Sequence, residues 1–181
     1  MTAERLPAGM WNASNGSRAD ERRTVNGMLQ TQPSVTQIAT LLIPVSGRQL
    51  VLPNVNIAEI IPYIAPTPVD DVPNWYLGTF TWRATLVPLV AFEAINDEPF
   101  TSPMANRRIA ILNNVIGDPT LPFCGIITEG LPRLMRLLPE EIAEDTELPA
   151  GPAEIARVLV NGERASIPNV AYIQTQLLKL L

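Results

Sequence analysis

The sequence predicts a mainly β fold that ends in one helix. Short apolar runs recur from residue 36 onward, turn-forming residues separate them, and an amphipathic segment closes the chain. Many short strands joined by turns indicate small barrels or a sandwich. The chain shows no strand–helix–strand alternation, so we expect no parallel sheet.

The first 35 residues differ from the remainder of the chain. Residues 13–17 are polar and turn-like, residues 18–23 carry charges of both signs, and no apolar period persists. We expect a disordered or loosely ordered tail over residues 1–35 and a folded domain over residues 36–181. Trp11 is then either a solvated tail residue or a point at which the tail docks.

Strands are expected in the first half of the domain wherever apolar runs lie between turn signals. Ser46-Gly47-Arg48 predicts a hairpin turn, and Asn54 is placed to cap a short helical turn. Prolines are dense over residues 62–74, which favours an extended loop. The predicted strands are 38–45, 49–52, 59–61, 75–80 and 86–92.

The second half repeats the pattern after a polar loop at residues 94–106. Asn161-Gly162 between two apolar runs is a strong hairpin signal, whereas the acidic residues 140–152 are typical of a loop. The predicted strands are 108–113, 123–128, 131–137, 156–160 and 164–167. Residues 168–181 predict a helix that begins near Pro168 or Asn169. One face of this helix carries Val170, Ile173, Leu177, Leu178 and Leu181.

Composition excludes several classes of site. The chain contains no histidine, which removes Ser-His-Asp and Cys-His relays and most zinc sites. Its single cysteine, Cys124, cannot form an internal disulfide, and we interpret it as a small buried apolar residue. The net charge of −5 lacks the basic footprint of a nucleic-acid binder. We therefore expect no cofactor and no metal, and the composition is compatible with a protein that has no catalytic residue and is not an enzyme.

The sequence also indicates where the protein works. The first 30 residues hold no apolar run suited to a signal peptide, and no stretch approaches 18 uncharged apolar residues. We expect a cytoplasmic protein without membrane insertion. The low charged fraction of 17% and the apolar fraction of 46% indicate a large core or surface reserved for partners.

Four stretches resemble the CheW-like chemotaxis coupling proteins. Residues 51–61 are similar to that family's strand, short turn and strand with an acid before isoleucine, here Glu59. Residues 73–92 are similar to its Pro, Gly, Asn-x-Arg-Gly and apolar strand, with Gly78 and Arg83 in the matching places. Residues 125–137 and the closing hairpin and helix complete the resemblance. Thr81, Ala84 and Glu129 stand where the family carries Asn, Gly and Asp.

The resemblance implies a fold and a function. The expected fold is two small, five-stranded, SH3-like β-barrel lobes with a C-terminal helix, divided at roughly residues 36–105 and 106–181. The expected function is a non-catalytic signalling adaptor that binds the regulatory domain of a chemosensory histidine kinase and the signalling tip of a chemoreceptor. The three departures would suit an accessory ChpC- or PilI-type coupling protein of a type IV pilus system that controls twitching motility.

The resemblance places the partner-binding surface at Ile57, Glu59, Gly78 and Arg83. The guanidinium of Arg83 stays charged and needs an acid or carbonyls, so Arg83 is either structural or a partner contact. Glu59 is either a solvated charge or a register-setting one. Gly78 predicts a turn with positive φ, a close approach of a partner's backbone, or both.

Other functions remain open at this stage. The chain would also suit a β-barrel protein- or ligand-binding module unrelated to chemotaxis. A histidine-free hydrolase would need an acid pair inside a pocket. The aromatic residues Trp75, Tyr76, Phe80 and Trp82 would suit a core, interface anchors, or the stacking platform of a single-strand-binding barrel.

Overall fold

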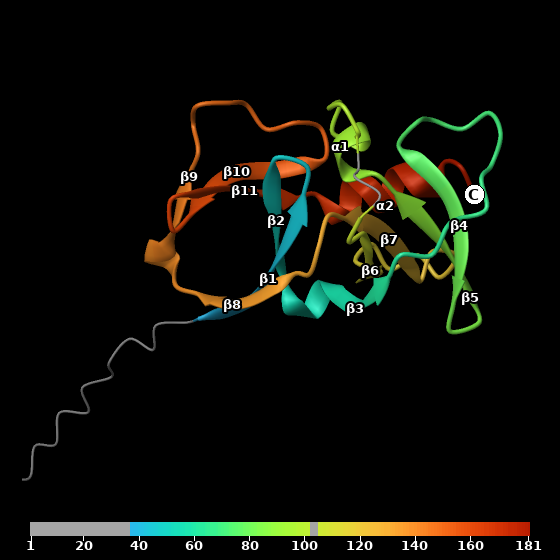
Figure 1. Ribbon diagram of the computed structural model, residues 1–181, viewed down its shortest axis with the longest axis horizontal. Helices are drawn as coiled ribbons and strands as arrows, with labels where there is room; N and C mark the ends of the chain where they lie inside the picture. The colour runs from blue at the N-terminus through green and yellow to red at the C-terminus, as the bar shows by residue number, and fades with distance from the viewer. Residues whose placement is uncertain (1–36, 102–104) are drawn as a thin grey trace, which may run out of the picture. The chain divides into compact units, whose positions relative to one another are not determined.

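A computed structural model describes residues 37–101 and 105–181 (Figure 1). The prediction of a loosely ordered tail over residues 1–35, including the role of Trp11, lies outside the described residues. The strands are β1 (Ile38–Val45), β2 (Arg48–Pro53), β3 (Ile57–Pro62), β4 (Tyr76–Trp82), β5 (Thr85–Val90), β6 (Arg108–Asn113), β7 (Phe123–Thr128), β8 (Arg133–Leu137), β9 (Ile142–Glu144), β10 (Glu154–Val160) and β11 (Glu163–Pro168). The helices are η1 (Asn54–Asn56), α1 (Phe92–Ile95), η2 (Pro139–Glu141) and α2 (Val170–Leu178).

The strands form two sheets, which define two lobes. Lobe A is the 6-stranded sheet in the order β8-β1-β2-β11-β10-β9, and lobe B is the 5-stranded sheet in the order β3-β6-β7-β5-β4. A mainly β fold with two lobes and a C-terminal helix is therefore confirmed. Lobe B has the expected five strands, whereas the short β9 gives lobe A a sixth.

The division of the lobes at residues 105 and 106 was wrong. Lobe A combines strands from both ends of the domain, and lobe B is inserted between them as residues 57–128. The physical reason is that β2 pairs with β11, in the register Ala165 with Gln49 and Ser166 with Leu50. This pairing joins segments that are far apart in the chain, and a local pattern of apolar residues carries no information about it.

The expectation of no parallel sheet was also wrong. The pair of β2 with β11 is parallel, as is the pair of β5 with β7, which aligns Leu89 with Gly125. Each parallel register is short, and the remaining strand pairs of both sheets are antiparallel. A sheet can therefore take in a parallel pair without a strand–helix–strand unit when the two strands are separated by other strands of the domain.

Local differences from the predicted elements have local causes. Phe92 begins α1 instead of ending a strand, and Asn54 lies inside η1 after the N-cap residue Pro53. The acidic stretch predicted as loop contains η2 and β9. Helix α2 has the expected start, because the Asn169 side chain accepts a hydrogen bond from the backbone N–H of Tyr172.

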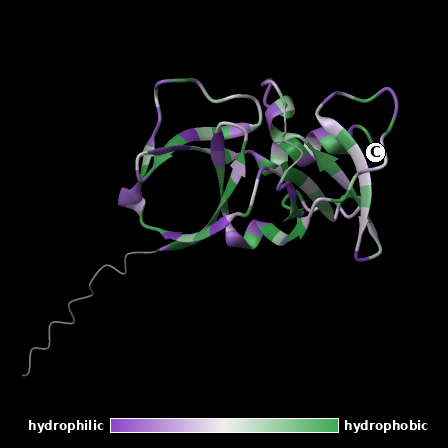
Figure 2. Cartoon of the chain, in the orientation of Figure 1, coloured by the Kyte–Doolittle hydropathy of each residue, from purple (hydrophilic) through white to green (hydrophobic). Residues whose placement is uncertain are grey.

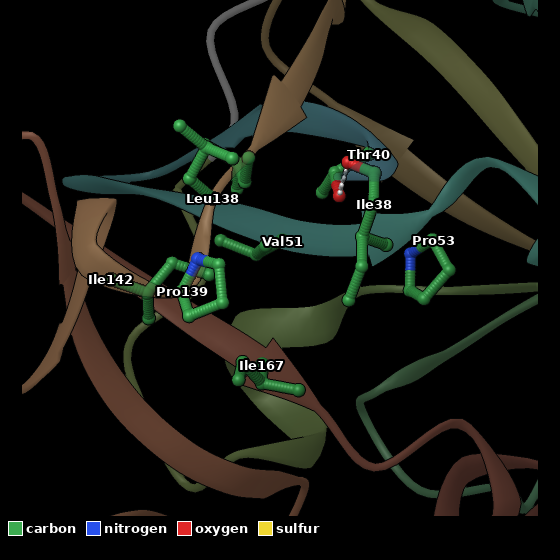
Figure 3. Close-up of a pocket in the computed structure, with 9 residues that line it drawn as sticks. Ile38, Thr40, Val51, Pro53, Leu138, Pro139, Ile142 and Ile167 are labelled. Carbon is green, nitrogen blue, oxygen red and sulfur yellow. Dashed lines mark hydrogen bonds between the residues drawn. The ribbon is translucent and has the colours of Figure 1, made fainter. Parts of the chain in front are cut away.

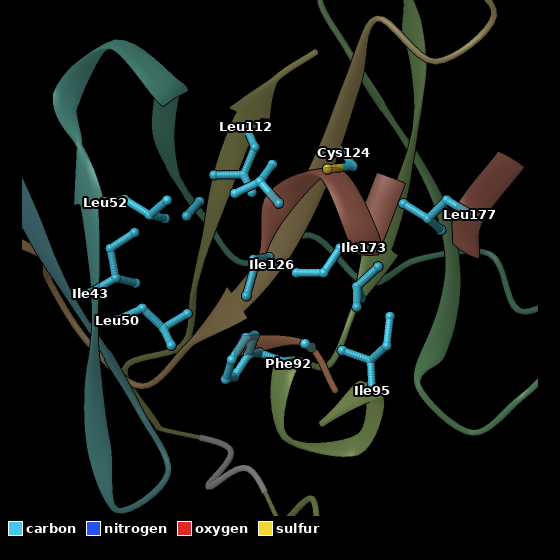
Figure 4. Close-up of a cluster of buried hydrophobic side chains, with 14 of the residues drawn as sticks. Ile43, Leu50, Leu52, Phe92, Ile95, Leu112, Cys124, Ile126, Ile173 and Leu177 are labelled. Atoms are coloured by element: carbon cyan, nitrogen blue, oxygen red, sulfur yellow. The ribbon is translucent and has the colours of Figure 1, made fainter. Parts of the chain in front are cut away.

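Apolar and polar residues alternate along the strands (Figure 2), and this alternation directs apolar side chains into separate clusters. Along β2, Leu50 and Leu52 face a cluster shared by the two lobes, while Val51 faces the interior of lobe A. Along β6, Leu112 faces the shared cluster and Ile111 faces the interior of lobe B. Helix α2 adds its own side chains to the shared cluster (Figure 4). The labelled residues there are Ile43, Leu50, Leu52, Phe92, Ile95, Leu112, Cys124, Ile126, Ile173 and Leu177.

Candidate functional site: a charged seam on lobe B and an apolar cavity in lobe A

The two edge strands of lobe B meet along a seam. Strands β3 and β4 lie at opposite ends of the sheet order, and side chains connect them. One carboxylate oxygen of Glu59, Oε2, accepts a hydrogen bond from Nε1 of Trp82 at 3.2 Å and from Nη2 of Arg83 at 2.7 Å. Glu59 follows a register shift in the pairing of β3 with β6, which is where a bulge re-aims a side chain. The seam residues are Glu59, Trp82 and Arg83.

Arg83 occupies the tip of the hairpin between β4 and β5. Trp82 pairs with Thr85, so Arg83 and Ala84 form a two-residue turn, and both have positive φ, at 47° and 62°. Such a turn matches the twist of a hairpin, but it is usually made by Asn-Gly because a Cβ is disfavoured there. The Cζ atom of Arg83 lies 4.6 Å from the centre of the Trp82 ring, a cation–π contact.

The seam is open to solvent on its charged side. The Arg83 side chain is 69% exposed and that of Glu59 is 39% exposed, whereas Trp82 is buried. An ion pair this exposed contributes about 0–1 kcal/mol to stability, so it is a weak structural element. It nevertheless presents a positioned guanidinium with unused N–H donors. Leu86, across the hairpin from Thr81 and 64% exposed, adds an apolar side chain that sequence analysis did not single out.

Gly78 lies in the middle of β4 and is buried. Its φ of 115° has the predicted positive sign, but Gly78 lies within a strand and not in a turn. A Cβ there would overlap the backbone carbonyl of Thr67. Thr67 and Thr79 exchange backbone hydrogen bonds of 2.7 and 3.1 Å, so the proline-rich loop covers this part of β4. The chain's own backbone therefore lies against Gly78, and a role for Gly78 in partner binding stays a prediction.

Ile57 begins β3, where it pairs with Leu112. It is half-buried and packs against the shared cluster. Of the four predicted partner-binding residues, Glu59 and Arg83 are thus brought into direct contact with each other. Arg83 pairs with an acid inside its own lobe, which is one of the structural roles that its charge required.

A second feature is an apolar cavity of about 280 Å³ in lobe A (Figure 3). It lies where the edge strands β8 and β9 approach through η2. The one polar side chain in its wall is Thr40, whose hydroxyl donates to the Ile38 carbonyl at 3.1 Å. The lining residues are Ile38, Thr40, Val51, Pro53, Leu137, Leu138, Pro139, Ile142 and Ile167. Sequence analysis missed this cavity, because it depends on pairings between both ends of the domain.

The described residues offer little for metal or covalent chemistry. Residues 37–101 and 105–181 contain no group of three or more Cys, Asp or Glu residues placed to hold a metal ion. Cys124 is fully buried, and this burial raises the pKa of its thiol to about 12. The thiol therefore stays protonated and un-nucleophilic at neutral pH. Within the same part of the chain, no helix is long and apolar enough to cross a membrane.

Comparison with known proteins agrees with this architecture. No curated protein matches the chain. A solved structure described as the scaffolding protein TtCheW from Thermoanaerobacter tengcongensis matches with a TM-score of 0.62 and 12% sequence identity, covering 74% of this chain and 89% of that one. At this identity the likeness shows the fold. The family model described as "CheW-like domain" matches residues 39–176, which include both lobes and most of α2, and the chain therefore belongs to the CheW-like domain family.

Proposed function

We propose that this protein is a non-catalytic signalling adaptor that couples a chemoreceptor to a chemosensory histidine kinase. Membership of the CheW-like family supports a scaffold in chemotaxis signalling. The observation that carries the proposal is the seam, where Trp82 and Glu59 position the exposed guanidinium of Arg83. Arginine is enriched among the residues that dominate protein–protein binding energy, and a guanidinium that is already positioned loses less rotamer freedom on binding.

An adaptor acts by binding two partners at once. If the affinity for one partner depends on the other, the protein links their conformational equilibria without any chemistry. The seam on lobe B and the apolar cavity in lobe A are separate surfaces, which supports simultaneous binding. We assign the receptor tip and the regulatory domain of the kinase as the two partners, and we place the adaptor in the cytoplasm.

The finer assignment is to a pilus-type system. The family's Asn and Gly positions around the arginine are Thr81 and Ala84 here, and Ala84 holds a left-handed conformation that glycine would adopt more readily. We propose that this altered hairpin selects the receptor and kinase of a type IV pilus system, as an accessory coupling protein would. The partners recovered from the source organism test this assignment.

The test is a pull-down of the full chain from extract of the source organism, with mass spectrometry as the readout. Glu59→Lys and Arg83→Ala should lose the kinase or the receptor, and the loss from Glu59→Lys should depend on salt because the contact is electrostatic. The matched control is Glu163→Lys in lobe A. It reverses the charge of an exposed glutamate, whose Oε2 lies 3.5 Å from Nη2 of Arg133. Unchanged recovery with both seam variants would contradict the proposal.

One alternative has an observation in its favour. The cavity in lobe A is large enough for a small apolar molecule, since an apolar cavity of roughly 150 Å³ already binds benzene. A ligand-binding module unrelated to chemotaxis would show saturable binding of such molecules. It would also leave the pull-down empty of kinase and receptor.

A further inference from the structure

The segment after β5 is anchored in lobe B. The backbone N–H of Ala91 donates to the carbonyl of Trp75 at 2.9 Å. Ala91 and Ala94 pack against Ile127 of β7 in a small apolar cluster. The Glu98 backbone N–H closes the segment on the carbonyl of Glu93 at 2.8 Å, so residues 91–98 form a fixed projection of lobe B.

Two polar side chains of this projection bind the backbone of lobe A. Oε1 of Glu93 accepts a hydrogen bond from the Ser46 N–H at 2.8 Å, in the turn between β1 and β2. Oδ1 of Asn96 accepts one from the Ala153 N–H at 3.1 Å, just before β10. Glu93 and Asn96 are each 3% exposed, so both contacts are shielded from water. Burial raises the pKa of Glu93, against the opposing effect of the hydrogen bond from Ser46.

Glu98 inserts a charge between two arginines of lobe A. Its oxygens accept from Nη1 and Nη2 of Arg48 at 2.9 and 2.5 Å, a bidentate pair, and Oε1 also accepts from Nη2 of Arg157 at 2.7 Å. The side chains of Arg48 and Arg157 are 13% and 16% exposed. Charge-assisted bonds at this burial are stronger and more directional than those at the surface.

Glu154 completes the network from the lobe A side. It binds Nε of Arg157 at 2.9 Å and lies 3.4 Å from Nη2 of Arg48, and its side chain is fully buried. Burial raises the pKa of Glu154, but hydrogen bonds from Ser166, the Gly151 backbone and Arg157 outweigh this effect and lower it overall. The carboxylate therefore remains ionised. It accepts a hydrogen bond from Nε of Arg157 and approaches Arg48 only to 3.4 Å, so the Nη groups of both arginines are left to bind Glu98.

From this geometry we propose that Glu93, Asn96 and Glu98 form an inter-lobe latch that fixes the orientation of lobe B on lobe A. The shared apolar cluster holds the lobes together, but apolar burial is non-directional and tolerates small sliding movements. The latch contacts are directional and reach three separate parts of lobe A. This inference concerns the free protein and holds whether or not the proposed partners are correct.

The test measures the distance between spin labels on the two lobes by pulsed electron paramagnetic resonance. The spin labels are attached to cysteines introduced at two exposed positions, Leu86→Cys in β5 and Ala143→Cys in β9. The native Cys124 is fully buried and stays unlabelled. In this doubly labelled protein, Glu98→Gln removes the charge while keeping the shape. Glu98→Asp keeps the charge but shortens its reach, and so serves if the first variant folds poorly.

We expect a single narrow distance distribution in the parent protein and a broadened or shifted one in both Glu98 variants. The control is Glu163→Gln, which removes an ion pair within lobe A and should leave the distribution unchanged. Circular dichroism establishes that each variant is folded. An unchanged distribution in a folded Glu98 variant would overturn the latch, because the shared apolar cluster would then suffice to fix the lobes.

Discussion

The two lobes fill their interiors differently. Lobe B uses large aromatic residues: Trp82 stacks edge-on against Phe123 with ring centres 5.0 Å apart, and Phe80 lies in the same cluster. The interior cluster of lobe A is built from aliphatic residues and methionine, and a cavity of about 280 Å³ lies beside it. Lobe B also joins its edge strands through Glu59. The difference teaches that aromatic side chains can fill the interior enclosed by a small curved sheet and can also position a polar group, here the Glu59 carboxylate, at its surface.

Removing the central ring of lobe B should have the largest effect. We expect Trp82→Ala to lower the free energy of unfolding by about 3–5 kcal/mol, because it removes a buried ring and its contact with Phe123. Urea denaturation measures this change. Trp82→Phe is the matched control and should lose much less, since it keeps a ring. A loss below about 1 kcal/mol for Trp82→Ala would mean that lobe B is no better filled than lobe A.

Substituting one glycine in each lobe compares how strongly the backbone there requires glycine. Gly78→Ala in lobe B should cost about 2–4 kcal/mol, because strained φ and a clash with Thr67 add together. Gly47→Ala in lobe A should cost only about 1 kcal/mol, since a Cβ there meets nothing within 4 Å and only the positive φ of 73° opposes it. Thermal unfolding of both variants checks the order. Equal losses would show that Thr67 yields to the new side chain.

The same substitution should have opposite signs in the two interiors. Val51→Ile places a methylene in the lobe A cavity and should stabilise by up to about 1 kcal/mol. Val87 in lobe B is fully buried, so Val87→Ile should destabilise by about 1–2 kcal/mol through overpacking. Denaturant midpoints measured side by side decide the matter. Destabilisation by both variants would indicate that the cavity wall of lobe A is as rigid as the packed interior of lobe B.

The hairpin turns should give the smallest effects. The turn of lobe A is Asn161-Gly162, with φ of 51° and 81°, whereas the turn of lobe B is Arg83-Ala84. Ala84→Gly should stabilise by about 0.5–1 kcal/mol, and Gly162→Ala should destabilise by about 1 kcal/mol. Calorimetric melting temperatures test both. A loss of stability in Ala84→Gly would show that the Ala84 methyl group makes a contact worth more than the strain.

Local patterns in the sequence predicted most of the secondary structure, and the resemblance to the CheW-like family singled out Glu59 and Arg83. The runs around β1 and β2, the Asn161-Gly162 turn and the Asn169 cap are determined by near neighbours, so they could be predicted. Glu59 and Arg83 were identified one at a time. Their contact depends on how far the five-stranded sheet curls, and that property belongs to the whole lobe.

Pairings between distant segments could not be predicted. The pairing of β2 with β11 assigns strands from both ends of the domain to one lobe. The residues near either strand form no pattern from which this pairing could be predicted. The lobe A cavity and the latch depend on that partnership, because Arg48 and Arg157 lie on strands from opposite ends of the domain. The acidic residues around η2 and β9 were assigned to a loop for the same reason, since β9 is defined by its pairing with β10.

The insertion of lobe B within lobe A has a consequence for biosynthesis. Strands β1 and β2 emerge from the ribosome first, yet their neighbours β8 and β11 are translated only after all of lobe B. Lobe B can therefore fold while lobe A is still an unfinished hairpin with exposed edges and apolar faces. The last strands to be made convert that hairpin into a sheet. Truncations or slow translation near the C-terminus should thus damage the lobe that contains the N-terminal strands, while sparing the one in the middle.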